Sequence, residues 1–185
     1  MSLPIYQAQF EKNKACVLVP TYNNAQTISG VLAQLLEYTS HVIVVNDGST
    51  DNTKELLGTI PQVRTVSYDS NRGKGYALRQ GFKEAAKLGY TYAITIDSDG
   101  QHYPVDLIKF LEQIERTPGA LIIGARNMNQ ENVPTKSSFG NRFSNFWFWV
   151  NTGVELPDTQ SGYRLYPLEK VAYKKYFSPK YEFEI

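Results

Sequence analysis

Two aspartates, Asp97 and Asp99, stand one residue apart where the apolar run of residues 91–96 ends. In an extended chain, side chains two residues apart point to the same side, and carboxylates this close raise each other's pKa unless a cation lies between them. Mg²⁺ or Mn²⁺ would relieve the repulsion, because such hard ions take oxygen ligands and share them with a diphosphate. Gln101 repeats the spacing with a carbonyl oxygen. The segment therefore predicts a divalent metal site formed by Asp97, Asp99 and Gln101.

The elements that must position these residues alternate between short apolar runs and amphipathic stretches. The pattern predicts strands at 15–19, 41–45, 63–68, 91–96 and 120–124. It predicts helices at 26–38, after Thr50 with Asp51 in the first turn, at 74–88, and from Pro104 onward. Strands that are apolar on both faces, separated by such helices, are typical of an α/β protein with a mostly parallel central sheet and helices on both faces.

Polar segments follow every predicted strand. They read PTYNN, NDGST, DSNRGKG, DSDGQH and GARN. In open parallel sheets, ligands bind beyond the carboxyl ends of the strands, so five polar segments at one edge predict a binding site. Each segment alone is also explained as a turn. A glycine-rich dinucleotide fingerprint does not follow the first strand, and no P-loop pattern occurs in the sequence.

The composition narrows the class of partner. The 185 residues carry 19 Lys and Arg against 18 Asp and Glu, which gives a formal net charge of +1. This near-neutral balance does not favour nucleic acid as a binding partner. The single cysteine, Cys16, excludes an intrachain disulfide framework. No apolar run approaches the roughly 18 residues that span a bilayer. We expect an N-terminal extension at 1–14, then one domain at 15–185, truncated at its C-terminus, in a cytoplasmic protein.

Six ordered segments carry a resemblance to a known family. They are PTYNN, VVNDGSTDNT, NRGKGYALRQGF, IDSDGQH, IIGAR and DTQSGYR. In order and spacing they resemble the family 2 glycosyltransferases with a GT-A fold, and within these the dolichyl- or polyprenyl-phosphate sugar synthases. The resemblance covers about residues 15 to 185. It implies a nucleotide-diphospho-sugar transferase that uses Mg²⁺ or Mn²⁺.

The resemblance also implies roles for individual residues at the donor end. Pro20 and Tyr22 match residues that wall the nucleotide base, and Val45 with Asp47 matches a pair that contacts base and ribose. The loop that binds metal and diphosphate matches Asp97, Ser98, Asp99 and Gln101. Lys74 and Arg126 are expected at the nucleotide sugar, with Arg126 near the donor phosphates. The chain departs from the family at Asn24 and Asn46, where Glu and Asp are usual, and this leaves the choice of base open.

The acceptor is less sharply defined. The resemblance implies a single inverting displacement onto a polyprenyl phosphate, with Arg142 near the acceptor phosphate. A phosphate is already ionised near neutral pH and needs no general base. A lipid or glycan hydroxyl would need one, and Asp158 is the candidate, although it is also explained as a turn residue after Pro157. A non-catalytic module that only binds nucleotide sugars is a third reading.

The aromatic segment KSSFGNRFSNFWFWVNTGV has two interpretations. Its aromatic residues recur at helical spacing, which is typical of a buried helix. The same pattern, flanked by Lys136 and Arg142, also suits a helix at the surface of a bilayer. The second interpretation predicts peripheral contact with the cytoplasmic face of a membrane, where a lipid acceptor would lie.

Overall fold

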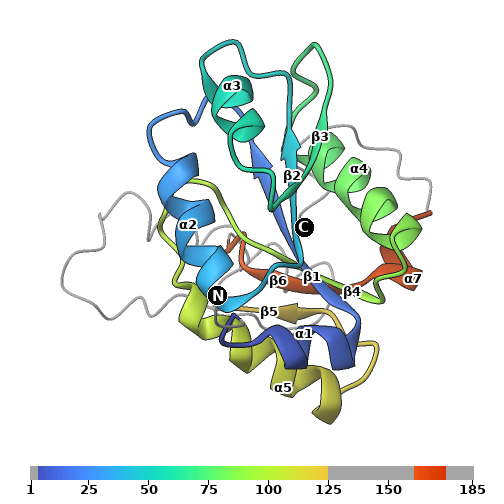
Figure 1. The fold of residues 1–185 in the computed structure, drawn as a ribbon. Helices are drawn as coiled ribbons and strands as arrows, with labels where there is room; N and C mark the ends of the chain where they lie inside the picture. The colour runs from blue at the N-terminus through green and yellow to red at the C-terminus, as the bar shows by residue number, and fades with distance from the viewer. Residues whose placement is uncertain (1–3, 125–160, 174–185) are drawn as a thin grey trace, which may run out of the picture.

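The computed structural model describes residues 4–124 and 161–173 of the chain (Figure 1). Within these residues the strands form one six-stranded sheet in the order β3-β2-β1-β4-β6-β5. The strands are β1 (Ala15–Thr21), β2 (Val42–Asn46), β3 (Arg64–Ser67), β4 (Tyr92–Thr95), β5 (Ile122–Ile123) and β6 (Arg164–Pro167). The first four run parallel, whereas β6 is antiparallel to both β4 and β5. The predicted α/β architecture with a mostly parallel sheet is confirmed.

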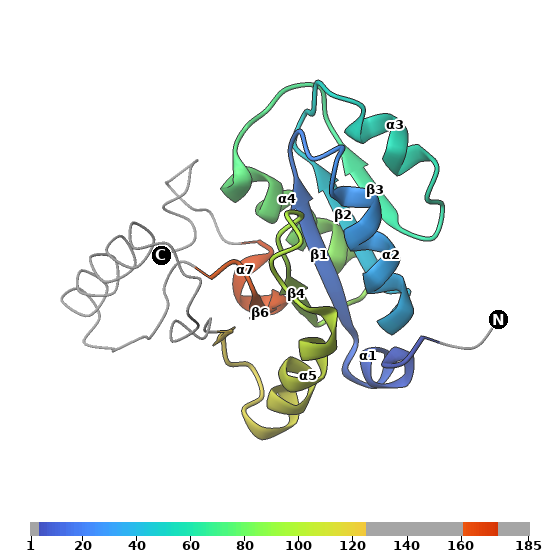
Figure 2. The same cartoon turned by 90° about the vertical axis from the view of Figure 1, so that its left-hand side faces the viewer.

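Helices cover both faces of this sheet (Figures 1 and 2). They are α1 (Gln7–Asn13), α2 (Ile28–Tyr38), α3 (Thr53–Gly58), α4 (Lys74–Lys87), the 3₁₀ turn η1 (Pro104–Asp106), α5 (Leu107–Arg116) and α7 (Leu168–Val171). Buried side chains of α1, α2, α3 and α5 pack on one face, and those of α4 and α7 pack on the other. None of the helices in the described part of the chain is long and apolar enough to cross a membrane.

The central strand β1 explains why the sheet needs helices on both sides. All seven of its residues are buried, because β2 and β4 flank it and a helical layer covers each face. Val17 and Val19 enter one core, and Cys16 and Leu18 enter the other, as the two-residue period of a strand requires. Gly81 of α4 lies so close to Leu18 that an added Cβ would overlap its side chain.

Several elements differ from the sequence prediction. Strand β3 is not apolar on both faces: Arg64 and Ser67 are exposed, because β3 pairs only with β2 at the edge of the sheet. The strand predicted at 120–124 is limited to β5, and Leu121 is exposed. Strand β6 was not predicted, because it has only four residues and follows a polar segment. So short a strand shows little of the alternating hydrophobic pattern from which strands are predicted.

Helix α1 lies within the residues that the sequence reading assigned to an extension. Its Phe10 is fully buried in the core shared with α2 and α5. The backbone N–H groups of Ile5 and Tyr6 donate to the carbonyls of Glu37 and Tyr38 at the end of α2, at 2.9 and 2.8 Å. The boundary near residue 15 stays a prediction, but α1 packs as part of the same globular unit.

Candidate active site

A cleft of about 610 Å³ lies beyond the carboxyl ends of the parallel strands. The chain adds β2 and β3 on one side of β1 and then returns to add β4 on the other side, so the strand order reverses between β1 and β4. Ligands of open α/β sheets bind at such a switch point. The cleft is lined by Pro20, Thr21, Tyr22, Asn24, Asp47, Asn71, Arg72, Gly73, Lys74, Ala77, Asp97, Ser98 and Asp99.

One wall of the cleft is the loop after β1, which is held against the loop after β2. Asn23 adopts a left-handed conformation with φ of 53°. Its side-chain oxygen accepts from the backbone N–H of Thr50 at 2.8 Å, and its own N–H donates to the Ser49 hydroxyl at 3.0 Å. These bonds fix the loop at the residue that follows Tyr22, and Tyr22 itself remains 44% exposed at the cleft. An exposed aromatic ring in a fixed loop can stack on a base.

Next to this wall, Asp47 directly follows β2, is buried, and contacts the loop before α4. Its carboxylate accepts from the Tyr68 hydroxyl at 2.5 Å, the Asn71 amide at 3.0 Å, and the N–H groups of Arg72 and Gly73 at 2.9 and 2.8 Å. Burial, followed by the contact with Asp47, raises the pKa of Tyr68, so its hydroxyl remains a donor. Asp47 therefore orders the loop that carries three cleft residues.

The floor of the cleft contains an ion pair between two elements. Lys74 Nζ, at the start of α4, lies 2.8 Å from Asp97 Oδ1, just beyond β4, and both side chains are about one quarter exposed. His102 Nε2 lies 3.7 Å from the other carboxylate oxygen. Burial alone would raise the pKa of Asp97, but the nearby His102 and Lys74 outweigh it and lower the pKa to about 2. Asp97 is therefore an anion throughout the physiological range.

Ser98 is held by two residues of the segment between β1 and α2. The Asn24 amide nitrogen donates to Ser98 Oγ at 2.5 Å, and the Thr27 hydroxyl donates to the Ser98 carbonyl at 2.7 Å. Ser98 is only 4% exposed, so these bonds fix the backbone between the two aspartates. The amide at position 24 thus has a structural role in this chain: it joins the loop after β1 to the Asp97–Asp99 segment.

The fit of a metal ion depends on Asp99. Asp99 is exposed at the cleft, and one of its oxygens accepts from the N–H of Gln101 at 2.9 Å. In the described ranges 4–124 and 161–173, no group of three or more His, Cys, Asp or Glu side chains could hold a metal by itself. Mg²⁺ usually binds through one or two carboxylates, several waters and substrate phosphates. The residues present therefore fit an ion shared with a bound diphosphate.

The structure brings most of the predicted site residues to the cleft and leaves others away from it. Those at the cleft are Pro20, Tyr22, Asn24, Asp47, Lys74, Asp97, Ser98 and Asp99. Val45 is instead buried in the sheet under α4, and Gln101 is exposed but does not line the cleft. Arg126, Arg142, Asp158 and the aromatic segment 136–154 lie outside the described residues.

Sequence reasoning missed five residues that line the cleft. They are Thr21, Asn71, Arg72, Gly73 and Ala77. Three of them belong to the polar segment DSNRGKG, which was recognised as a loop at the site, although only Lys74 was assigned to the ligand. The signal that could have found Arg72 and Gly73 is their position directly before the helix that carries Lys74.

The fold is of the GT-A type, and sequence comparison identifies the family. Residues 16–172 match glycosyl transferase family 2, which is most of the chain. The chain therefore belongs to this family, as the sequence predicted. It is 29% identical over 170 residues to UDP-N-acetylglucosamine–dolichyl-phosphate N-acetylglucosaminyltransferase of Methanococcus voltae, covering 81% of this chain and 68% of that protein.

Two further comparisons extend the picture. Polyprenol monophosphomannose synthase of Mycolicibacterium smegmatis is 29% identical over 186 residues, covering 93% of this chain and 69% of its own. The crystal structure of glucosyl-3-phosphoglycerate synthase from Mycobacterium tuberculosis with Mn²⁺, UDP-glucose and phosphoglyceric acid superposes with a TM-score of 0.72. It is 20% identical, covers 100% of this chain and 67% of that one, and so supports the fold alone. The chain thus spans about two thirds of the length of these proteins.

Proposed function

We propose that this protein transfers a sugar from a nucleoside-diphosphate sugar to a polyprenyl phosphate by a single inverting displacement. The main support for the proposal is the set of charged residues in the cleft. Asp97, Asp99 and Lys74 line it together at the switch point of the sheet, and Lys74 pairs with Asp97. The names of the two relatives, which act on dolichyl phosphate and form polyprenol monophosphomannose, support the acceptor class.

The chemistry requires stabilisation of the leaving diphosphate, because negative charge develops there as the glycosidic bond breaks. Lys74 and Arg72 line the same cleft and supply positive charge from the start of α4 and the loop before it. Asp99 would hold Mg²⁺ or Mn²⁺, which supplies further charge stabilisation when bound. Tyr22 and Pro20 are proposed to bind the base. Arg126 is proposed to contact the donor phosphates from outside the described residues.

The attacking group distinguishes the proposed function from its alternative. A polyprenyl phosphate arrives ionised, since its second pKa is about 6, and it requires a cation to orient it, which we assign to Arg142. A lipid or glycan hydroxyl would require Asp158 as general base. The lipid acceptor also requires the protein to reach a membrane, and contact through residues 136–154 stays a prediction.

The metal is tested by calorimetry of nucleoside diphosphate with Mn²⁺ or with EDTA. We expect tighter binding with Mn²⁺, and we expect Asp99→Asn to abolish this difference, because an amide is a weaker ligand for a hard ion. Asp106→Asn is the matched control, since Asp106 pairs with Lys109 at 2.6 Å and does not line the cleft. Equal affinity of the unaltered protein in Mn²⁺ and EDTA would contradict metal-assisted binding.

The acceptor is tested by a transfer assay with polyprenyl phosphate and a panel of nucleotide sugars. We expect Arg142→Ala to lower turnover by about 30-fold or more, because removing one partner of a buried charge pair costs about 2–5 kcal/mol. Asp158→Asn should change turnover little. If Asp158→Asn abolishes transfer while Arg142→Ala does not, the acceptor is a hydroxyl. Nucleotide-sugar binding without transfer to any acceptor would favour the non-catalytic alternative.

A further inference from the structure

Thr27 stands at the start of α2, but its hydroxyl does not cap that helix. Thr27 is the N-cap residue of α2, and its side chain makes no capping hydrogen bond. A threonine at this position usually accepts from an N–H group of the first helical turn. Here the hydroxyl instead donates to the carbonyl of Ser98 at 2.7 Å. The hydroxyl of Thr27 therefore serves the loop after β4 and not its own helix.

The Ser98 carbonyl belongs to the peptide group that joins Ser98 to Asp99. Because a peptide group is planar and rigid, a hydrogen bond to its oxygen restrains its orientation and the position of the next Cα atom. Ser98 is buried, whereas Asp99 and Gly100 are both exposed. Gly100 has φ of 81°, a conformation that favours glycine. The bond from Thr27 thus acts at the boundary where burial stops holding the chain, directly before Asp99.

A second hydrogen bond reaches Ser98 from the same turn of the chain. The Asn24 amide nitrogen donates to Ser98 Oγ at 2.5 Å. The Asn24 carbonyl accepts from the N–H groups of Thr27 and Ile28 at 3.1 and 3.0 Å, so residues 24–28 form one hydrogen-bonded turn. Ile28 is fully buried, and the Asn24 N–H donates to the Thr53 hydroxyl at 3.1 Å. The turn that holds Ser98 is itself anchored in the core and on α3.

We propose that Thr27 is a positioning residue for the divalent ion. Together with Asn24 it holds Ser98, and it thereby determines where the Asp99 carboxylate meets an ion shared with the diphosphate. The ion and the diphosphate in this inference rest on the proposed function. Thr27 does not line the cleft, and none of the sequence motifs includes it. Because Thr27 acts through Ser98 and Asp99, its loss should weaken the metal-dependent part of nucleotide binding and spare the rest.

The experiment compares three variants with the unaltered protein. Thr27→Val removes the hydroxyl and keeps the branched shape, and Thr27→Ser keeps the hydroxyl. Thr59→Val is the matched control, because the Thr59 hydroxyl also donates to a backbone carbonyl at 2.7 Å, that of Leu56, but does not line the cleft. Calorimetry measures nucleoside diphosphate affinity in Mn²⁺ and in EDTA. NMR relaxation of the ligand-free protein measures the order parameter of the Asp99 N–H, which reports motion on the ps–ns timescale.

We expect Thr27→Val to weaken affinity in Mn²⁺ about 3- to 10-fold, the effect of losing one hydrogen bond, and to change affinity in EDTA less than about twofold. The order parameter of the Asp99 N–H should fall in Thr27→Val. Thr27→Ser and Thr59→Val should keep both the affinity and the order parameter of the unaltered protein.

Two results would overturn the proposal. One is an unchanged affinity of Thr27→Val in Mn²⁺, and the other is an equal loss of affinity in Mn²⁺ and in EDTA, which would indicate a general disturbance of the cleft. Failure of the proposed function is recognised separately: the unaltered protein would then bind no nucleotide. In that case an unchanged order parameter of the Asp99 N–H in Thr27→Val would still refute the positioning role by itself.

Discussion

At the scale of single residues, the close approach of Gly162 to Asp97 constrains the shape of the cleft. Gly162 precedes β6, and its carbonyl accepts from the Thr95 hydroxyl at 2.7 Å. A Cβ added at Gly162 would overlap the Asp97 carboxylate. The position of the Asp97 side chain, which pairs with Lys74, therefore depends on Gly162, a residue far away in sequence. Only glycine at position 162 leaves space for the Asp97 carboxylate.

Gly162→Ala tests this contact. We expect a loss of about 1–3 kcal/mol of stability, because a methyl group is forced into a filled space, together with weaker nucleoside diphosphate binding as Asp97 is displaced. Gly30→Ala is the matched control: Gly30 is exposed in α2 with nothing within 4 Å of an added Cβ. That variant should gain about 0.5–1 kcal/mol. Chemical denaturation and calorimetry measure both quantities. Unaltered binding in Gly162→Ala would show that Asp97 tolerates displacement.

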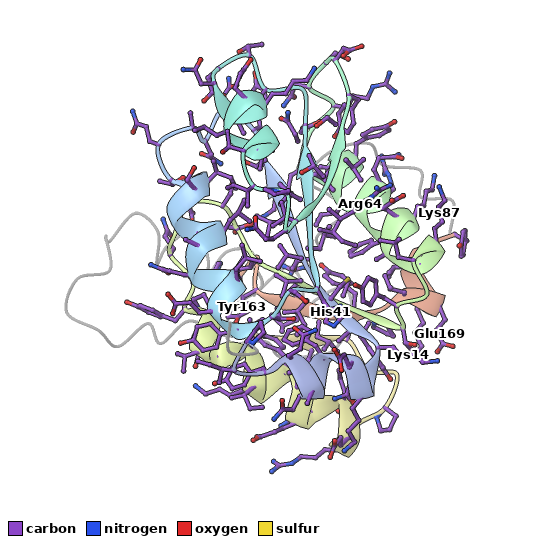
Figure 3. All side chains as sticks on the ribbon, viewed as in Figure 1. Lys14, His41, Arg64, Lys87, Tyr163 and Glu169 are labelled. Atoms are coloured by element: carbon purple, nitrogen blue, oxygen red, sulfur yellow. The ribbon has the colours of Figure 1, made fainter. Side chains whose placement is uncertain are left out.

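At the scale of elements, α1 is joined to the sheet through His41, which is labelled in Figure 3. His41 directly precedes β2, so it lies at the opposite end of this strand from the cleft. The oxygen of the Gln7 amide accepts from the Ser40 N–H at 3.0 Å, so its nitrogen donates to His41 Nε2 at 3.0 Å. His41 Nδ1 is then the protonated nitrogen and donates to the Tyr90 hydroxyl at 2.9 Å. The network needs a neutral imidazole.

This network predicts a pH dependence of stability. Burial lowers the pKa of His41, and the opposing effect of Glu11, whose carboxylate lies 3.9 Å away, is smaller. As the pH falls below about 6.5, the unfolded chain takes up a proton more readily than the folded one, so the free energy of unfolding decreases. His41→Gln should flatten this decrease between about pH 6.5 and 5, whereas His102→Gln should retain the His41 contribution. Denaturant unfolding measures the free energy of unfolding at each pH in this range. If this free energy falls as steeply with decreasing pH in His41→Gln as in the unaltered protein, the prediction is wrong.

At the scale of the whole molecule, the site depends on loops that leave three parallel strands and on the segment that opens α4. The loops after β1, β2 and β4 contribute Tyr22, Asp47 and Asp97, which are far apart in sequence. Hydrogen bonds join neighbouring loops, from Asn23 to Thr50 and from Asn24 to Ser98. A ligand that fills the cleft would therefore stabilise the native state as a whole.

Thermal unfolding provides the corresponding measurement. Nucleoside diphosphate with Mn²⁺ at 100 times its Kd should stabilise the protein by about 2.7 kcal/mol, which raises Tm by about 5–10 °C for a chain of this size. Mn²⁺ alone should raise Tm much less, because the described residues do not form a complete metal site without a diphosphate. An equal shift with Mn²⁺ alone would contradict a shared ion.

The sequence alone predicted most of the first four strands, helices at the positions of α2, α3, α4 and α5, and a binding site at the carboxyl ends of the strands. These features are local: α4 follows from the apolar spacing of Ala77, Leu78 and Phe82, and β1 from an uninterrupted apolar run. Because parallel strands end at one edge of the sheet, the segments after them could be assigned to one cleft without coordinates. Family resemblance added the transfer reaction, and the family and fold are confirmed by comparison.

Only the tertiary structure decided which residues meet within that cleft. The pairing of Lys74 with Asp97, the contact of Gly162 with the same carboxylate, and the four donors to Asp47 join residues separated by more than 20 positions. The antiparallel pairing of β6 and the packing of α1 through Phe10 are likewise set by partners distant in sequence. Hydrophobic periodicity shows which residues of a segment are buried, but not which other segment packs against them. These contacts depend on the packing of the whole chain and therefore could not be predicted from the local sequence pattern.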